Sequence, residues 1–144
     1  MKIKFDHINV TISNLEESLS WYQNILGMRL LEKGVKPDGS RWAIVGLDES
    51  MICMNEYPNR SRANSFKFEN YQINHLGIRI SDEKEWLRRV EDFHLDLLYG
   101  GLNQYPHSKS WYVADPDGHE FEISFTNNQP MKFPPLKKGG LHAK

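Results

Sequence analysis

The chain has 144 residues, which suits one compact domain or two small repeated halves and is too short for a two-domain enzyme of ordinary size. Hydrophobic residues make up 39% and charged residues 26% of the sequence, the composition of a folded globular protein. Eighteen Lys and Arg against 19 Asp and Glu leave a net charge of -1, so no basic field favours nucleic acid or a membrane surface. We expect a small molecule as the binding partner.

The cysteine content and the first residues bear on the cellular compartment. The single cysteine, Cys53, excludes an internal disulfide and a Cys-x-x-Cys zinc site. The chain leads directly into a strand pattern without the apolar segment of a signal peptide, and it contains no stretch of 18 apolar residues. These features predict a soluble, cytoplasmic protein that does not bind membranes.

An internal repeat with an offset of 68 residues is the most informative feature. The segment 6–13 (DHINVTIS) recurs as 74–81 (NHLGIRIS). In both copies apolar and polar residues alternate, which is typical of a strand with one buried face. His7 and His75 occupy matching positions on the two polar faces. Each histidine therefore points away from the packed side of its strand.

Each of these strands precedes a predicted helix. The helices begin at capping sequences in 13–16 and 81–84, with Ser13 and Glu16 forming a capping box, and their apolar residues recur at helical spacing. Two pairs of later strands align at the same offset: 43–47 with 111–115, and 51–57 with 119–125. The repeat predicts one α+β domain over residues 1–126, built from two tandem βαβββ modules. Its parts are module one (3–57), a linker (58–73) and module two (74–126), followed by a C-terminal tail (127–144).

Three polar-face residues have the chemistry of metal ligands. On the last predicted strand Glu122 alternates with Phe121 and Ile123, which places it on the polar face. Together with His7 and His75 it supplies two imidazoles and a carboxylate, the ligand set of open divalent-metal sites. A lone strand histidine is usually not a ligand, but the symmetric placement of these residues favours a metal site.

The chain resembles the vicinal oxygen chelate superfamily, which includes glyoxalase I, fosfomycin-resistance transferases, bleomycin-resistance proteins and extradiol dioxygenases. The resemblance covers residues 3–126 and rests on three motifs: His-Ile-x-Val-x-Ile from residue 7, Trp21-Tyr22-x-x-x-Leu26-Gly27, and Asp115-Pro116-Asp117-Gly118-His119-x-Phe121-Glu122. It implies a cleft around one divalent ion (Zn, Ni, Mn or Fe) held by His7, His75 and Glu122. It also implies a substrate with vicinal oxygens and a homodimer whose subunits can share the ligands.

The fourth ligand position separates branches of this family. Glyoxalase I has a Glu there that also acts as a general base, whereas subtracting 68 from Glu122 places Met54 at this position. A thioether neither binds a hard ion well nor accepts a proton. Glu56, two residues further along the same face, is the candidate substitute base. Cys53 is predicted to be a small core residue.

The leading hypothesis is a metal-dependent enzyme with glyoxalase I-like lyase or isomerase chemistry. Glu122 or Glu56 would move the proton, and Tyr112 is a further catalytic candidate. An alternative is an antibiotic-resistance enzyme, a thiol transferase of the fosfomycin type, which uses three ligands. The Lys and Ser with which that group binds the phosphonate fall on two other residue types here, Leu102 and Pro106, which leaves three possible substitutes: Lys109, Arg79 and Arg41.

Two further alternatives depend on aromatic residues. Tyr112 with the nearby His107 partly matches the signature of an extradiol dioxygenase. A non-catalytic protein of the bleomycin-resistance type would hold a flat or cationic ligand between Trp42, Trp111 and Tyr112, without a metal. The presence of all three ligand residues favours an enzyme over such a binding protein.

Overall fold

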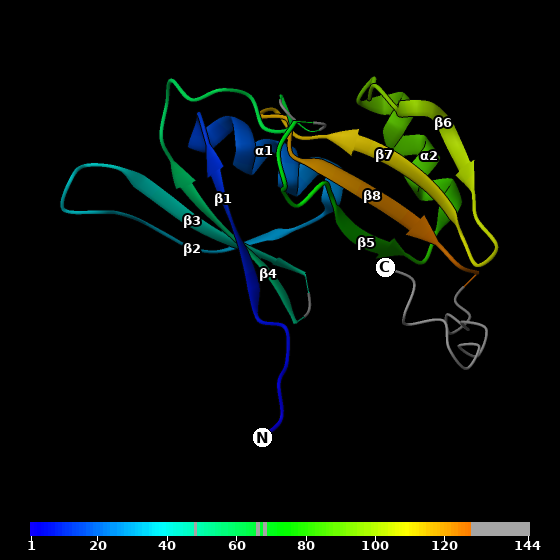
Figure 1. Cartoon of the computed structure of the whole chain (residues 1–144), viewed down its shortest axis with the longest axis horizontal. Helices are drawn as coiled ribbons and strands as arrows, with labels where there is room; N and C mark the ends of the chain where they lie inside the picture. The colour runs from blue at the N-terminus through cyan, green and yellow to red at the C-terminus, as the bar shows by residue number, and fades with distance from the viewer. Residues whose placement is uncertain (48, 66, 68, 128–144) are drawn as a thin grey trace.

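The computed structural model describes residues 1–47, 49–65, 67 and 69–127, which form two βαβββ modules (Figure 1). The first module contains β1 (His7–Ile12), α1 (Leu15–Leu26), β2 (Arg29–Val35), β3 (Arg41–Leu47) and β4 (Ser50–Glu56). The second contains β5 (Leu76–Ile80), α2 (Glu83–Asp92), β6 (Leu98–Gln104), β7 (Lys109–Ala114) and β8 (Glu120–Phe125). The predicted α+β class and element order are confirmed. The predicted tail lies outside the described residues from residue 128 onward.

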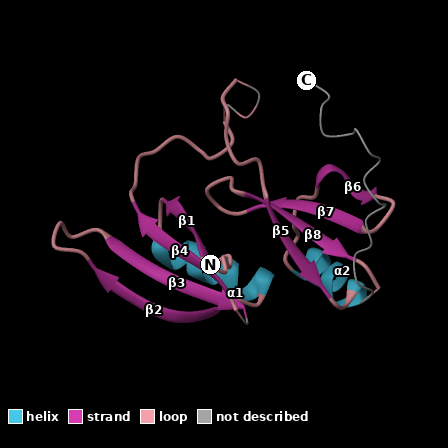
Figure 2. Ribbon diagram, turned by 60° about the horizontal axis from the view of Figure 1, so that its bottom comes forward, coloured by secondary structure: helices cyan, strands magenta, loops and turns pink. Residues whose placement is uncertain are grey.

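The two sheets have the same topology, as the internal repeat predicts. The strand orders are β1-β4-β3-β2 and β5-β8-β7-β6, and in each sheet the first pair is parallel and the others antiparallel. Figure 2 shows each helix lying against one face of its sheet, which leaves the other face uncovered by helices. The strands led by His7 and His75 are therefore edge strands.

The helices begin at polar caps within the predicted segments. Asn14 accepts the backbone N–H of Glu17 at 3.0 Å, and Asp82 does the same for Glu85 at 3.0 Å. The first cap is therefore Asn14, and the predicted capping box based on Ser13 is wrong by one residue. Capping from Asn14 satisfies an otherwise unpaired N–H of the first turn.

The apolar core is shared between the modules because α1 contacts both sheets. Trp21 and Tyr22 pack against Phe121 of β8, with ring centroids 5.7 and 5.6 Å apart. Tyr22 and Phe121 are fully buried, and one continuous cluster of buried residues includes Trp86 of α2. Burial of such large aromatic surfaces ties the two modules into a single hydrophobic unit.

A buried carboxylate fixes the turn between β7 and β8. Asp115 is 2% exposed and accepts hydrogen bonds from the Tyr22 hydroxyl at 2.8 Å and from the backbone N–H groups of Asp117 and His119 at 3.0 and 2.8 Å. The His119 ring nitrogen Nδ1 also lies 2.8 Å from it. Burial, reinforced by the charge of Asp115, raises the pKa of Tyr22 far above its ordinary value, so the hydroxyl remains a donor.

The inter-module linker is fastened to this turn. Arg62 donates to the carbonyl of Pro116 at 2.8 Å, and the Ala63 N–H donates to the carbonyl of Asp117 at 2.8 Å. Gly118 has φ +93°, and a Cβ at this position would lie 2.7 Å from the Ala63 carbonyl oxygen. A glycine is required here for both its dihedral angle and the close approach of the linker.

We expect loss of the Tyr22 hydroxyl to loosen the joint between the modules. Tyr22→Phe should lower the free energy of unfolding by about 1–3 kcal/mol, because a buried bond to a charged acceptor is lost. Tyr57→Phe is the control, since its hydroxyl receives only a 3.3 Å contact from Lys36 and should cost less than about 0.5 kcal/mol. Urea unfolding measures both, and equal effects would contradict this role of Asp115.

Candidate metal and substrate site

The structure brings two of the three predicted metal ligands together on the open face of the second sheet. Nε2 of His75, just before β5, lies 3.1 Å from Oε2 of Glu122 on β8. Two ligands bound to one ion at about 2.1 Å and at right angles are about 3.0 Å apart, so this spacing fits two neighbouring coordination positions. The assignment of these side chains as ligands stays a prediction.

The Glu122 carboxylate is held in place by a residue that the sequence reasoning missed. The buried hydroxyl of Ser110 donates to Oε1 of Glu122 at 2.7 Å, while Oε2 faces His75. Ser110 precedes the buried Trp111 on β7, and neighbouring residues of a strand lie on opposite faces. Strand alternation alone would therefore have predicted that Ser110 shares the face of Glu122.

Tyr112 forms the wall beside the pair. It is the cross-strand partner of Glu122, and its ring meets that of His75 edge-on at 5.4 Å. Its hydroxyl lies 2.9 Å from the Tyr105 hydroxyl. Burial, then the hydrogen bond to Tyr105 and the charge of Glu122, raise the pKa of Tyr112 above its ordinary value. Tyr112 therefore keeps its proton near neutral pH and can donate a hydrogen bond.

The third predicted ligand lies elsewhere in the chain. His7 is on the exposed start of β1 in the first sheet, where its Nδ1 contacts Asp6 at 2.5 Å. Within the described residues, no three His, Cys, Asp or Glu side chains converge closely enough to hold a metal ion. One copy of the described chain thus supplies two of the three expected ligands to a common point.

The strand register corrects the prediction for the fourth position. Asn9 and Gly77 are related by the offset of 68, but their cross-strand partners are Cys53 and Glu122, which are 69 residues apart. The half-exposed Cys53 is therefore the counterpart of Glu122 on the open face, and its predicted place in the core is wrong. Met54 is fully buried on the opposite side.

One additional residue in the second module explains the error. Gly46 pairs with Met51 across a connection of four residues, whereas Ala114 pairs with Glu120 across five. A shift of one residue moves every side chain of a strand to the other face. For residues of β8, an offset of 68 therefore gives the neighbour of the structurally equivalent residue in β4: Met54 in place of Cys53 for Glu122.

Glu56, the predicted substitute base, lies on the helix side of the first sheet. Its carboxylate accepts two hydrogen bonds from Arg41, at 2.8 and 2.5 Å, and one from the Leu15 N–H at the start of α1, at 2.7 Å. The hydrogen bond from Arg41 holds the pKa of Glu56 below its ordinary value, despite the opposing effect of burial. A carboxylate held in this way is a weak proton acceptor, and its catalytic role stays a prediction.

The three aromatic residues of the binding-protein hypothesis do not share one surface. Trp111 is 2% exposed and belongs to the core, on the face opposite to its neighbour Tyr112. Trp42 lies on the first sheet, where it is the cross-strand partner of Asn55. A cage of these three rings is therefore not formed within one chain.

A linker lysine reaches the open face of the second sheet. Lys67 donates to Glu120 at 2.7 Å and to the Tyr99 hydroxyl at 2.6 Å. Tyr99 packs edge-on against Tyr112 at 5.2 Å. The paired charges of Lys67 and Glu120 cancel beside the Glu122 site. Tyr99 has φ +54°, next to two glycines, so its strand position did not follow from alternation.

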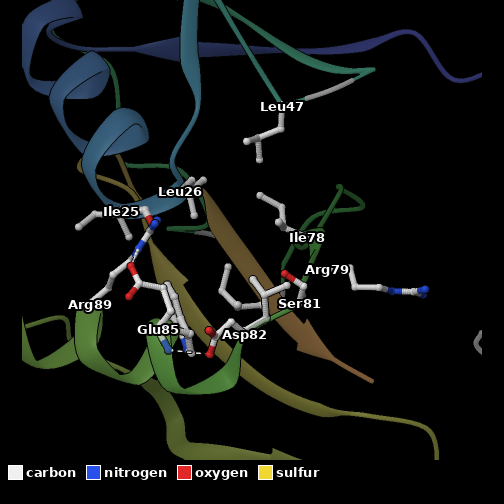
Figure 3. A pocket seen from close by; sticks show the side chains of 12 residues that line it. Ile25, Leu26, Leu47, Ile78, Arg79, Ser81, Asp82, Glu85 and Arg89 are labelled. Atoms are coloured by element: carbon white, nitrogen blue, oxygen red, sulfur yellow. Dashed lines mark hydrogen bonds and ion pairs between the residues drawn. The ribbon is translucent and has the colours of Figure 1, made fainter. Parts of the chain in front are cut away.

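Hollows lie on both sides of β5. A pocket of about 680 Å³ lies between β5 and the first sheet; His75, Gly77 and Arg79 border it, and most of its lining is apolar, including Ile8, Ile52 and Phe121. A smaller pocket of about 240 Å³ lies on the helix side, where Arg89 donates to the Ile25 carbonyl at 2.9 Å (Figure 3). Figure 3 shows the Arg79 side chain directed away from this helix-side pocket.

Comparison with known proteins identifies the family. The Glyoxalase/Bleomycin resistance protein/Dioxygenase superfamily matches residues 4–123, and the chain belongs to it. It is 28% identical over 120 residues to metallothiol transferase FosB of Staphylococcus saprophyticus, covering 82% of this chain and 74% of that protein. It is 29% identical over 120 residues to lactoylglutathione lyase of Neisseria meningitidis, covering 81% and 86%.

Solved structures agree on the fold. A mutant of the fosfomycin resistance protein FosX of Listeria monocytogenes, complexed with Mn(II) and 1S,2S-dihydroxypropylphosphonic acid, matches with a TM-score of 0.66 and 20% identity. The match covers 86% of this chain and 93% of that one. Among the described helices, none is long and apolar enough to span a membrane.

The contacts of Glu56 predict a pH-dependent stability effect. Because its pKa is lowered on folding, its contribution is present above the ordinary carboxyl pKa of about 4 and is lost as the pH falls through the lower folded value. Glu56→Gln should lower the free energy of unfolding by about 1–2 kcal/mol at pH 7, and the difference should shrink below about pH 4. Glu91→Gln, an exposed change on α2, is the control. A pH-independent difference would contradict the assignment.

Proposed function

We propose that the protein is a metal-dependent thiol transferase that joins a small thiol to an oxygen-bearing electrophile. The observation that carries the proposal is the His75–Glu122 pair, oriented by Ser110 on an open sheet face. A divalent ion bound there would act as a Lewis acid that stabilises negative charge on a substrate oxygen. The relative named metallothiol transferase FosB supports the same assignment.

The face of the first sheet favours thiol transfer over isomerisation. The counterpart of Glu122 is Cys53, and Glu56 is bonded to Arg41 on the other side of the sheet. Proton abstraction from a substrate carbon needs a placed base of suitable pKa. Neither residue is a carboxylate base on the open face. A thiol, by contrast, can lose its proton to water near neutral pH; its thiolate would then form a C–S bond as a C–O bond of the electrophile breaks, and the released oxygen would take up a proton from water.

The third ligand would come from His7 of a second copy. Its strand is an edge strand of the first sheet, and the repeat relates His7 to His75. A two-fold dimer presents the first module of one copy to the second module of the other at two equivalent sites. Such pairing would complete both sites, each with two imidazoles and one carboxylate.

Tyr112 would donate a hydrogen bond to the substrate. Its hydroxyl remains protonated near neutral pH and is paired with that of Tyr105. An oxygen that gains negative charge beside His75 and Glu122 would meet this donor. Glu122, already bonded to Ser110, would serve as a ligand and not as the proton carrier.

The glyoxalase I-like reaction remains the second candidate because lactoylglutathione lyase of Neisseria meningitidis is 29% identical to the chain. The two candidates are separated by assay. Protein loaded in turn with Mn²⁺, Zn²⁺, Ni²⁺ or Fe²⁺ is given fosfomycin with cysteine or glutathione, and separately the hemithioacetal of methylglyoxal and glutathione. We expect metal-dependent consumption of the thiol in the assay with fosfomycin and no turnover of the hemithioacetal. Turnover of the hemithioacetal without thiol consumption in the fosfomycin assay would favour the glyoxalase I-like lyase reaction. Activity with neither substrate would contradict both candidate functions.

Metal binding supplies a test that does not depend on substrate. Ser110→Ala should weaken Mn²⁺ binding by about tenfold, because it releases the Glu122 carboxylate. His75→Ala should abolish tight binding, with the fold retained by circular dichroism. Ser124→Ala, which removes the hydroxyl across the strand from Ser110, is the control and should bind Mn²⁺ like the wild type. Calorimetric titration measures all three, and unchanged affinity in His75→Ala would refute the site.

A further inference from the structure

Beside the His75–Glu122 pair, the open face contains an unfilled position. Gly77 lies on β5 between His75 and Arg79, directly across from Glu122. A Cβ added to Gly77 would meet no heavy atom within 4 Å. The residue does not have a positive φ, so its backbone does not require glycine. Glycine in a strand weakens the strand and often marks a place where a ligand approaches the backbone.

A free guanidinium borders the same space. Arg79 follows Gly77 by two residues on the same face, about 6.6 Å along the strand. Its side chain points away from the helix side of the sheet (Figure 3). It is exposed, and within the described part of the chain it makes no hydrogen bond or ion pair.

The other cations considered for anion binding are already paired. Arg41 is bonded to Glu56 on the helix side of the first sheet, and Lys109 donates to Glu83 at 2.9 Å. Lys67 is neutralised by Glu120 at 2.7 Å. Arg79 is thus the cation on this face whose charge is still available to a ligand, as far as the described residues extend.

We infer that the space above Gly77 is the seat of an oxyanion of the substrate, a phosphonate, phosphate or carboxylate, bound by Arg79 while a neighbouring oxygen faces His75 and Glu122. A divalent ion balanced by one carboxylate leaves excess positive charge, to which Arg79 adds, so the face is complementary to an anion. Guanidinium binds such groups through two parallel hydrogen bonds. The inference rests on the proposed function in one respect, the metal at the adjoining pair.

Two substitutions test the seat by different physical means. Arg79→Gln removes the charge, and Gly77→Leu adds a side chain at a position where a Cβ would meet no heavy atom within 4 Å. Methylphosphonate and acetate are titrated calorimetrically into the Mn²⁺-loaded protein, after Mn²⁺ binding has been measured for each variant. Each substitution should weaken binding of the preferred probe by about tenfold and leave the Mn²⁺ affinity within about twofold. Arg88→Gln, on α2 behind the same sheet, is the control and should bind the probe like the wild type.

The outcomes separate this inference from the proposed function. A wild-type protein that binds no Mn²⁺ contradicts the proposed function, and titration of the metal-free protein still tests whether anion binding depends on Arg79. Normal Mn²⁺ binding with anion affinities unchanged in Arg79→Gln and Gly77→Leu overturns the seat alone, as does a wild type that binds neither probe at millimolar concentration. If Gly77→Leu raises the urea midpoint of unfolding and abolishes anion binding, this would support the inference that glycine at this position leaves room for the anion.

Discussion

The buried carboxylate of Asp115 is the interaction on which the arrangement of the two modules depends. It holds the hydroxyl of Tyr22 from the first module, orders its own turn and contacts the ring of His119. The same turn receives the linker through the carbonyls of Pro116 and Asp117. A charged group buried in this way is tolerated because each lone pair has a partner, and loss of a partner is correspondingly costly.

The contacts of Asp115 between the two modules determine which side chains of one chain can meet on an open sheet face. They pack α1 against the second sheet, so the helix-facing sides of both sheets share a core while their open faces remain accessible. His75 and Glu122 then meet on one open face, and His7 lies on the other sheet, apart from them. The same packing that stabilises the single chain therefore leaves the proposed metal site with two of its three expected ligands. A second copy is the physical means by which the site would be completed.

Strand alternation and the internal repeat were sufficient to predict the fold and the meeting of His75 with Glu122. The prediction for β4 was wrong because the turn before β8 has one residue more than the turn before β4. An offset of 68 therefore selects the opposite face of β4, and it gave Met54 where the structure has Cys53. The same alternation places Ser110 on the face of Glu122, but Ser110 was not among the predicted site residues. Lys67 was not predictable, because a linker side chain reaches the sheet only through tertiary hydrogen bonds.

Subunit complementation is the most direct test of the claim that the metal site is divided between copies. His7→Ala and His75→Ala proteins, each expected to lack tight Mn²⁺ binding, are unfolded together and refolded as an equal mixture. Random pairing places one intact site in each mixed dimer, so about a quarter of the wild-type Mn²⁺ capacity should return. A mixture that recovers no capacity, or a His7→Ala protein that binds Mn²⁺ fully on its own, would contradict the account.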